Sequence, residues 1–545
     1  MLFNSVTFLV YFLPAALAGY FVLGLKRLNG LAIVWLTLTS LFFYGWWNIR
    51  YVPLLLGSIA VNFVIGRSLA HKPRKWLLVA GVALNLLLLG VCKYTGFLVA
   101  AANGLVGADW PVPEILLPLA ISFFTFQQIA YLSDAYDGVA EEPSLANYCM
   151  FITFFPHLIA GPITHHREML PQFRNPSIFR PRPMMLAAGC TVFLIGLFKK
   201  TFIADTLSIW VGPVFAAADA GHAMTALDAW LGAGCYMLQI YFDFSGYTDM
   251  AIGLGLMFGI RLPQNFDSPY KARNIIEFWS RWHMTLTRFL TAYIYNPISL
   301  NLNRARLRKG KPVLRRGRTS PGAFAGLVAM PMIVTMFLAG LWHGAGWQFI
   351  VFGLLHGFYL TVNHAWRTLK AYWGWQVDSA NPLVHGASVL LTMLCVLIAL
   401  VFFRAADVGS GLALLSDMLA AHGLFIPYYP YDDAQWAHQL ATLSDTRALP
   451  SPVIDLVTHN EFRFALIALL IVWCLPNTQQ FLRRYPTSLG QVRGPTWIET
   501  KLRAAAQVLT WRPTMMFGAL VGTIGFFALT KTFSSAPTEF LYWKF

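Results

Sequence analysis

The sequence predicts an all-α integral membrane protein, and this prediction rests on its composition and on how its apolar residues are arranged. Of the 545 residues, 57% are hydrophobic and only 12% are charged, whereas a soluble globular domain carries about 25% charged residues. Because a spanning helix needs about 20 apolar residues, the chain provides for roughly 11–13 membrane helices, with re-entrant or amphipathic segments between them. This composition excludes a soluble enzyme, a disordered chain and a disulfide scaffold.

The predicted membrane segments are the apolar runs, and in two of them prolines indicate an interrupted span. In chain order the runs are 6–25, 31–49, 52–69, 76–102, 114–133, 146–163, 184–211, 226–257, 322–342, 345–366, 384–404, 461–475 and 513–532. Pro118 lies inside the fifth run and Pro156 inside the sixth. Because proline lacks a backbone donor and interrupts a helix, both runs are candidates for re-entrant segments.

The net charge of +16 reflects membrane topology, and we expect no nucleic-acid partner. Lys and Arg gather in short segments between apolar runs, at Lys26-Arg27, Arg67–Lys75 and Arg304–Arg318, as the positive-inside rule predicts for cytoplasmic loops. The last segment also suits an acidic partner, anionic lipid head groups or the phosphates of a CoA-like donor. The loop 422–460 has a single basic residue, Arg447, so we expect it to be extracytoplasmic, and the alternation places the N-terminus outside.

Residues 272–303 differ from an ordinary span, because their apolar side chains recur at helical spacing. The apolar positions are Ile275, Phe278, Trp282, Leu286 and Phe289, and the opposite positions are Arg281, Thr285 and Arg288. This pattern predicts an amphipathic helix that lies in the interface or lines a cavity.

Ionisable residues in an apolar context are costly, so each is a candidate for function. The candidates are His157, Asp243, Asp249, His283, His343, His356 and His364. The chain contains no phosphate-binding loop, no G-x-S-x-G and no H-E-x-x-H motif, which excludes the usual signatures of nucleotide-driven transport and serine-hydrolase chemistry. Six scattered cysteines without a C-x-x-C pair indicate no zinc site, and no metal ligand set is expected.

His343 is the first candidate for chemistry. It follows Trp342 in A-G-L-W-H-G-A-G-W, where glycines on both sides allow a substrate or another backbone to approach the ring. A neutral imidazole is the usual side chain for taking a proton from a hydroxyl group. The alternative is a structural histidine that forms a hydrogen bond between two helices.

His283, on the amphipathic segment, is the second candidate. The alternative is a histidine without a role in chemistry, on a polar helix face where its hydrogen bonds are satisfied. Together His283 and His343 indicate a site where this segment meets the Gly-rich span. We interpret His356 and His364 as structural, because they lie two helical turns apart. Four further polar residues lie near His283 in the sequence, namely Asp243, Ser245, Asp249 and Asn265. They either form a hydrogen-bonded network that supports the site or only satisfy the hydrogen bonds of one another and of the broken backbone around them.

Several long stretches resemble the membrane-bound O-acyltransferase family, in particular its bacterial alginate O-acetylation branch. They include ISFFTFQQIAYLSDAYDG, FFPHLIAGPI, QIYFDFSGYTDMAIGLGLMFGIRLPQNFDSPYKARNIIEFWSRWHMTLTRFL, AGLWHGAGWQFIVFGLLHG and the closing FLYWKF. The resemblance implies that the His of L-W-H-G, His343 here, is catalytic and that the His of R-W-H, His283 here, is the second functional histidine. Where the family commonly has two arginines before Trp-His, this chain has Ser280-Arg281, which leaves any anchoring role to Arg281.

The resemblance further implies one membrane domain over residues 1–545, in which tilted helices form a ring around a funnel. The expected parts are N-terminal helices to about residue 110, a catalytic core at about 111–370 and C-terminal helices at about 371–545. The expected supporting residues are Arg281, Trp282, Asp243, Asn265 and Trp342. The implied location is the bacterial inner membrane, in contact with its lipids.

The function that this resemblance implies is transfer of an acyl group, most simply acetyl, from a cytoplasmic thioester to an extracytoplasmic acceptor. The co-substrate is acetyl-CoA or an acyl carrier, with no bound cofactor, and the product is a modified exported polysaccharide such as alginate. Expected partners are an extracytoplasmic acetyltransferase or relay protein and the polysaccharide biosynthesis machinery. Peptidoglycan O-acetylation and D-alanyl transfer to teichoic acid are the alternatives within the family. A polysaccharide transporter or a non-catalytic scaffold is the alternative outside it.

Overall fold

The chain folds into a helical membrane protein, as its composition predicts. The structure, a computed structural model, describes residues 1–314, 319–375, 381–421, 460–490 and 510–541. Within these ranges every regular element is a helix, and β-pairing is confined to one isolated bridge between Pro263 and Leu489. Seven described helical stretches are long and apolar enough to cross a membrane, namely Thr7–Leu25, Ile49–His71, Lys75–Val106, Pro183–Asp219, Pro321–His343, Pro382–Arg404 and Met515–Ser534. The prediction of a multi-pass α-helical protein is confirmed.

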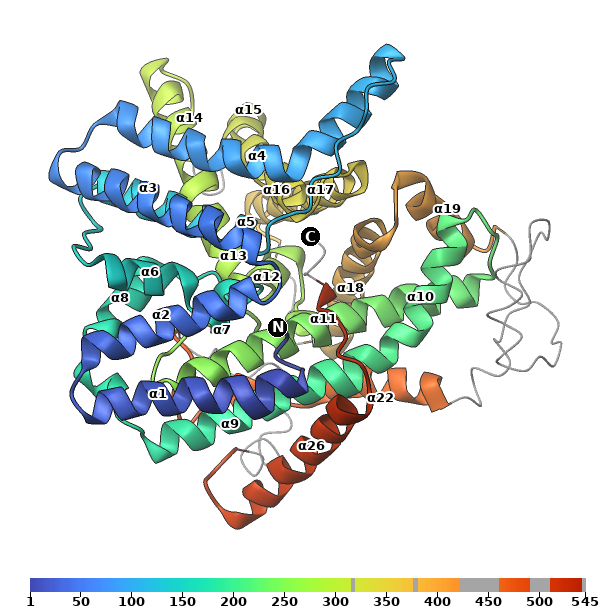
Figure 1. Cartoon of the computed structure of the whole chain (residues 1–545). Coiled ribbons are helices and arrows are strands. Elements are labelled where there is room, and N and C mark those ends of the chain that lie inside the picture. The colour runs from blue at the N-terminus through green and yellow to red at the C-terminus, as the bar shows by residue number, and fades with distance from the viewer. Residues whose placement is uncertain (315–318, 376–380, 422–459, 491–509, 542–545) are drawn as a thin grey trace.

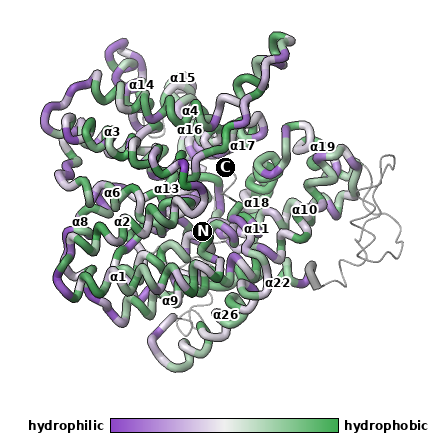
Figure 2. Tube along the Cα trace, viewed as in Figure 1, coloured by the Kyte–Doolittle hydropathy of each residue, from purple (hydrophilic) through white to green (hydrophobic). Residues whose placement is uncertain are grey.

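The first 106 residues form long helices that follow the predicted runs. They are α1 (Leu13–Leu25), α2 (Asn29–Gly45), α3 (Val52–His71) and α4 (Lys75–Val106). In Figure 1 the turns after α1 and between α3 and α4 lie on the same side of the molecule. These turns contain Lys26-Arg27 and part of Arg67–Lys75, and Figure 2 shows hydrophilic residues gathered on that edge while apolar residues follow the helices.

The two runs predicted as candidates for re-entrant segments, 114–133 and 146–163, depart from regular spans. The run 114–133 becomes helical only from Ile121, where α5 (Ile121–Tyr136) begins after a stretch without regular structure. The run 146–163 is interrupted at Phe154, between α6 (Leu145–Thr153) and the short α7 (Phe155–Leu158). Pro156 lies in the first turn of α7, where its missing N–H costs little.

The centre of the molecule is α11 (Ala226–Met257), whose residues from Cys235 to Met257 are all buried. It packs along α9 (Pro183–Phe198), which continues through residues 199–204 into α10 (Asp205–Asp219). Glycines allow this contact: a Cβ atom at Gly196 would overlap the carbonyl of Gly246, and one at Gly253 would crowd the carbonyl of Gly189. Small residues at such a crossing are typical of helix pairs in membranes.

The amphipathic segment 272–303 is not one helix, so the prediction of a continuous helix was wrong. It is divided into α12 (Ile275–Trp279), α13 (Met284–Leu290) and, after residues 291–295, α14 (Asn296–Arg308). The break falls at His283, whose φ of 42° is left-handed. The loop before α12 causes it, because Asp267 N–H donates to the Arg281 carbonyl and Met284 N–H donates to the Asn265 carbonyl, which holds the chain out of a helical path.

The C-terminal part places a helical hairpin beside this broken segment. The hairpin is α16 (Met330–His343) and α17 (Trp347–Trp373), preceded by α15 (Pro321–Phe324). The remaining described helices are α8 (His166–Phe173), α18 (Pro382–Arg404), α19 (Val408–Met418), α22 (Asn460–Cys474), α23 (Thr478–Phe481) and α26 (Met515–Ser534). The predicted loop 422–460 lies almost entirely outside the described residues, as do the last four residues of FLYWKF and part of Arg304–Arg318.

Candidate active site

His343 is the last residue of α16, and its side chain is 2% exposed. Its imidazole packs edge-on against Phe403 of α18 and Phe352 of α17, with ring centroids 5.1 and 5.7 Å apart. The chain leaves the helix directly after it, because Gly344 is extended, with φ −165°. The ring is therefore held at a helix end inside the protein.

Glycines bring the two arms of this hairpin together, as their spacing around His343 suggests. A Cβ atom at Gly340 would overlap the carbonyl oxygen of Phe349, and one at Gly353 would overlap that of Met336. The backbones of α16 and α17 therefore touch near the end of α16 where His343 lies. This contact fixes the direction in which the imidazole leaves its helix.

His283 is fully buried, and Asn265 determines which of its nitrogens carries the hydrogen. The Asn265 Oδ1 atom accepts from the Thr285 backbone N–H at 3.3 Å and from the Thr285 hydroxyl at 2.8 Å, which identifies it as the oxygen. The His283 Nδ1 atom lies 3.0 Å from the same oxygen and so donates to it. Burial lowers the pKa of His283 to about 3, so the ring is neutral and its acceptor lone pair lies on the Nε2 atom.

Trp342 connects the two histidines. Its ring centroid lies 4.9 Å from that of His343 and 6.1 Å from that of His283. The opposite side of the indole belongs to an aromatic stack, in which Phe126 lies 5.4 Å from Trp342 and 4.2 Å from Phe289. The structure thus brings His283, His343 and Trp342 together, as the sequence analysis expects.

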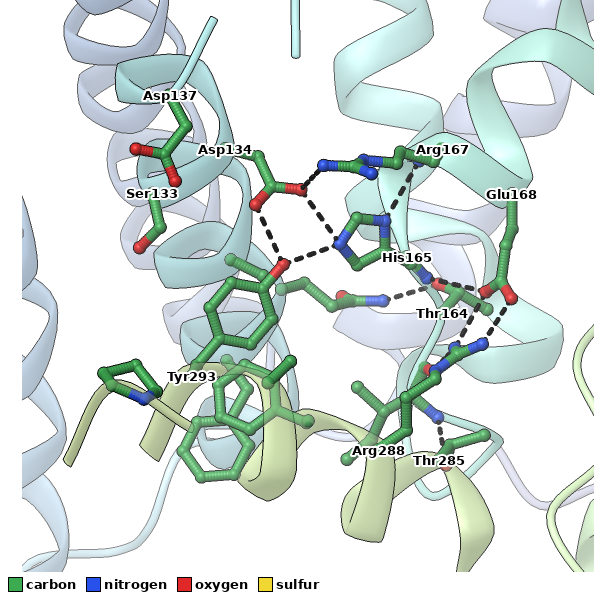
Figure 3. A pocket seen from close by; sticks show the side chains of 17 residues that line it. Ser133, Asp134, Asp137, Thr164, His165, Arg167, Glu168, Thr285, Arg288 and Tyr293 are labelled. Carbon is green, nitrogen blue, oxygen red and sulfur yellow. Dashed lines mark hydrogen bonds and ion pairs between the residues drawn. The ribbon is translucent and has the colours of Figure 1, made fainter. Parts of the chain in front are cut away.

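A cavity of about 560 Å³ approaches this centre from α5, α8 and α13 (Figure 3). Phe126 and Phe289 of the aromatic stack form part of its wall, and so does Thr285, which is bonded to Asn265. Its lining contains three carboxylates, Asp134, Asp137 and Glu168, and two guanidinium groups, those of Arg167 and Arg288. The cavity is therefore polar around Asp134 and Glu168 and aromatic at Phe126, which stacks on Trp342.

The polar end of the cavity is organised around Asp134. Its carboxylate accepts from Tyr293 at 3.2 Å and lies 3.2 Å from both His165 Nε2 and an Arg167 nitrogen, as Figure 3 shows. Burial alone would raise the pKa of Asp134, but the hydrogen bond from His165 and electrostatic interactions with His165, His166 and Arg167 lower it. The carboxylate is therefore ionised, and it anchors α5 to α8 and to Tyr293.

Asp134, His165 and His166 also place one ligand atom each within 4.8 Å of one another, a spacing that a metal ion accepts. The hydrogen bonds of His165 argue against this use. Its Nδ1 atom accepts from the Arg167 backbone N–H at 3.3 Å, so a neutral ring carries its hydrogen on Nε2, where a metal would need a lone pair. We therefore interpret the cluster as a hydrogen-bonded anchor. Sequence reasoning did not identify it, although the adjacent pair His165-His166 was a visible signal.

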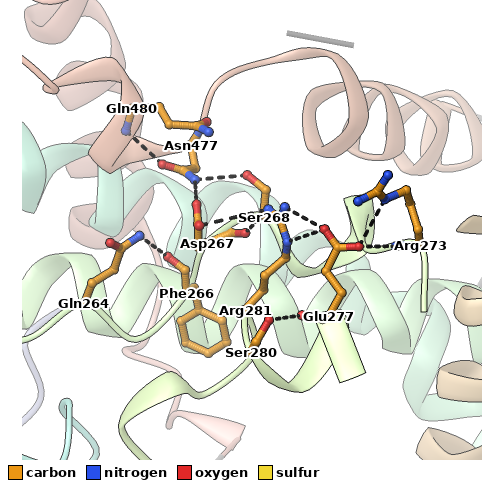
Figure 4. A network of polar contacts seen from close by, with 10 residues as sticks. All are labelled: Gln264, Phe266, Asp267, Ser268, Arg273, Glu277, Ser280, Arg281, Asn477 and Gln480. Atoms are coloured by element: carbon orange, nitrogen blue, oxygen red, sulfur yellow. Dashed lines mark hydrogen bonds and ion pairs between the residues drawn. The ribbon is translucent and has the colours of Figure 1, made fainter. Parts of the chain in front are cut away.

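Arg281 and Trp282 have supporting positions away from the cavity. The Arg281 guanidinium donates to Glu277 at 2.8 Å and to the Asp267 carbonyl at 3.0 Å, so it connects α12 to the loop 264–268 (Figure 4). Trp282 packs among aromatic rings, 5.1 Å from Phe266 and 5.7 Å from Phe278. Both residues hold the bend at His283 in place.

Asp243 and Asp249 do not join Asn265 in one network, because lysines hold each of them separately. Asp243 lies 2.7 Å from the Lys200 ammonium, and Asp249 lies 2.6 Å from that of Lys199. Of the polar residues near His283 that the sequence analysis names, these two aspartates therefore pair with lysines and not with Asn265. Each aspartate is held by the charge of its partner lysine. Neither lysine was among the candidate residues.

Replacing Asn265 with leucine is expected to destabilise the protein by about 1–3 kcal/mol, because His283 and Thr285 would lose a buried acceptor. Asn265→Asp keeps the acceptor and is expected to cost less. Thermal unfolding of the purified protein in detergent measures both, with Asn301→Leu on exposed α14 as the control. Equal midpoints for Asn265→Leu and the wild type would contradict the assigned hydrogen bonds.

Comparison of the sequence with known proteins identifies the family of the chain. Residues 135–309 match the model of the membrane-bound O-acyltransferase family. A peptidoglycan O-acetyltransferase of Helicobacter pylori is 35% identical over 100% of this chain and 98% of its own length. A probable alginate O-acetylase of Azotobacter vinelandii is 37% identical over 74% of this chain and 75% of its own, and a teichoic acid D-alanyltransferase of Bacillus subtilis is 26% identical over 49% and 63%. The chain therefore belongs to the membrane-bound O-acyltransferase family and is a multi-pass membrane O-acyltransferase.

Proposed function

We propose that the chain transfers an acetyl group from a cytoplasmic thioester to a hydroxyl group of an extracytoplasmic acceptor for the modification of a glycan, and that His343 and His283 perform the transfer. The observation that supports this most directly is the placement of both imidazoles against Trp342, where the aromatic wall of the cavity ends. A thioester carbonyl that reaches Trp342 from the cavity meets both rings. The charged part of the donor does not have to cross the membrane, because only the acetyl group passes.

The charge of the cavity suits the uncharged arm of a thioester better than its phosphates. Three carboxylates outnumber two guanidinium groups in the lining, and Arg288 is already occupied by Glu168 at 2.9 Å. Cations lie outside instead, on α14, which begins at the cavity beside Pro297 and ends with Arg304, Arg306 and Arg308. We propose that donor phosphates, or an acidic carrier protein, stay at α14 while the thioester arm enters. This assignment places the cavity on the cytoplasmic side of the inner membrane.

The reaction requires one base, which moves one proton from the acceptor hydroxyl to the leaving sulfur. His343 takes the proton from the acceptor hydroxyl, the oxygen attacks the thioester carbonyl, the C–S bond breaks, and the proton goes to the leaving sulfur. No bound cofactor takes part. A role for His283 as a hydrogen-bond donor to the carbonyl oxygen would require hydrogen on Nε2, whereas its bond to Asn265 puts the hydrogen on Nδ1. We therefore propose that His283 accepts a hydrogen bond, from the acceptor hydroxyl or from the product thiol, and orients it.

We propose the acceptor from the share of this chain that aligns with each group of relatives. The relative named for peptidoglycan aligns with the whole chain, whereas the alginate relatives align with about three quarters of it or less and the teichoic acid relatives with about half. We propose peptidoglycan as the first acceptor and an exported polysaccharide such as alginate as the second. In either case an extracytoplasmic relay protein or acetyltransferase completes the modification.

Deletion of the gene in its own host tests this proposal. Ester-linked acetate, released by mild base, is measured on peptidoglycan and on exported polysaccharide, together with the amount of each polymer. We expect acetate to be lost from one polymer whose amount is unchanged, and to return when the wild-type gene is restored. Unchanged acetate on both would overturn the proposal, and loss of the polymer itself would indicate a transporter.

The donor side is tested with membrane vesicles of both orientations. Radiolabelled acetyl-CoA added to inside-out vesicles is expected to lose its label in a reaction that requires His343, whereas right-side-out vesicles are expected to leave it intact. Consumption only in right-side-out vesicles would refute a cytoplasmic donor.

A further inference from the structure

A lysine within an apolar helix lies beside the backbone of His343. Lys93 belongs to α4, one of the seven spanning stretches, and its side chain is partly buried. A lysine ammonium in such a helix is costly unless it finds polar partners. The partners of Lys93 are backbone carbonyls of another helix, α16, about 250 residues later in the chain.

The contacts from α4 reach three consecutive carbonyls of α16. The Lys93 ammonium donates to the Trp342 carbonyl at 2.5 Å and to that of His343 at 3.3 Å. The neighbouring Tyr94 hydroxyl donates to the Leu341 carbonyl at 2.7 Å. The last carbonyls of a helix lack partners within the helix and carry partial negative charge, so a cation there is favourable. Lys93 and Tyr94 therefore cap α16 at the end that carries His343.

The cap matters because little else continues the helix beyond His343. The next residue, Gly344, is extended, and Gly346 is extended as well, with φ −171°. Without donors from α4, the last turn of α16 would have unsatisfied carbonyls inside the protein and would be free to unwind. The imidazole would then move with its backbone.

The position of α4 is itself fixed, so the cap is a rigid one. Two turns before Lys93, the Asn85 side chain donates to Asn62 of α3 at 2.7 Å, and Asn62 donates in turn to Gln128 of α5. These buried amides set the register of α4 against its neighbours. Because these bonds fix α4 along its axis, the Lys93 ammonium is held at the end of α16.

We propose that Lys93 is a positioning residue for acyl transfer, which acts through the backbone of His343 and not on the substrate. This inference rests on the proposed role of His343 as the base. Because a displacement of about 1 Å at a reacting group can cost about 100-fold in rate, loss of the cap should reduce turnover more than substrate binding.

The test uses the full-length protein in inside-out vesicles, with radiolabelled acetyl-CoA as the donor. Lys93→Met keeps the length of the side chain but removes its donors, and it is expected to lower kcat about 10–100-fold with little change in the KM for acetyl-CoA. Lys93→Arg retains a cation with donors and is expected to restore most of the rate. Lys75→Met, at the exposed start of the same helix, is the matched control and is expected to match the wild type.

A double variant separates positioning from a general structural role. If Lys93 acts through His343, Lys93→Met should have little further effect on the residual rate of His343→Gln. The inference would be overturned if the rate reductions of Lys93→Met and His343→Gln multiplied in the double variant. A wild-type kcat for Lys93→Met would overturn it as well. Should Lys93→Met fail to fold, Tyr94→Phe removes only the bond to Leu341, and about a 3–10-fold lower kcat is then expected. An unchanged kcat in that variant would also overturn it.

The two proposals fail in different ways. If His343→Gln itself retains the wild-type rate, the proposed base is wrong, and the positioning role fails with it. If His343→Gln is inactive but Lys93→Met is fully active, the proposed function stands and only the role of Lys93 is refuted.

Discussion

Replacing His343 with glutamine is expected to lower the rate of acyl transfer by about 10²–10⁴-fold, the usual contribution of a general base. Glutamine has a similar length and a polar end, so α16 should keep its packing against Phe352 and Phe403. The amide cannot take a proton from a hydroxyl group at physiological pH. The measurement is acetyl-CoA consumption in inside-out vesicles, together with ester-linked acetate on the glycan, at matched amounts of membrane protein.

The matched control is His364→Gln on α17, which removes an imidazole from the neighbouring helix at a position that is only partly buried. We expect it to retain the wild-type rate. If both variants lose activity to the same extent, the loss reflects packing of the hairpin. If His343→Gln remains active, the base has to be sought elsewhere, first at His283.

Replacing Lys200 with methionine is expected to destabilise the protein by about 3–5 kcal/mol, because it leaves buried carboxylates without their cation. The Lys200 ammonium lies 2.7 Å from Asp243 and 2.8 Å from Asp205, and it donates to the Glu539 carbonyl at 3.0 Å. Without it, two negative charges would face each other in the interior. Thermal unfolding of the purified protein in detergent measures the effect as a lower midpoint or a lower yield of folded protein.

Two further variants make this result specific. Lys531→Met, on the exposed side of α26, removes a lysine from another span and is expected to leave the midpoint unchanged. Adding Asp243→Asn to Lys200→Met removes one of the stranded charges and is expected to recover part of the loss. A midpoint for Lys200→Met equal to that of the wild type would show that these ion pairs contribute nothing to stability.

Much of the helical architecture was predictable because its causes are local. The predicted run 226–257 coincides with α11, since Thr225 caps its first turn by accepting from Asp228 N–H and Gly259, with φ 77°, follows its end. The flanking glycines marked His343 as a candidate in the sequence, and the structure shows what these glycines do. Gly340 allows α16 to touch α17, and Gly344 ends the helix.

The break at His283 was not predictable from the segment itself. The periodicity of 272–303 is helical, and the bend is imposed by Asn265 and Asp267, which lie outside that segment. The lysines were missed for a different reason. Lys93, Lys199 and Lys200 carry the same signal as the candidate histidines, an ionisable side chain in an apolar run, but lysine is also read as a mark of a helix end. Their partners, backbone carbonyls in one case and aspartates in the others, become visible only in three dimensions.

The pairing of adjacent lysines with α11 has a consequence for biogenesis. Lys199 and Lys200 lie in the middle of the stretch Pro183–Asp219, and their carboxylate partners Asp249 and Asp243 belong to the next long helix. Inserted alone, the first stretch would expose the Lys199 ammonium to lipid, because only Lys200 has a carboxylate partner within the same stretch, Asp205. In the same way, α11 alone would expose Asp243 and Asp249. We therefore expect the two helices to leave the translocon together, as a hairpin in which these groups are paired.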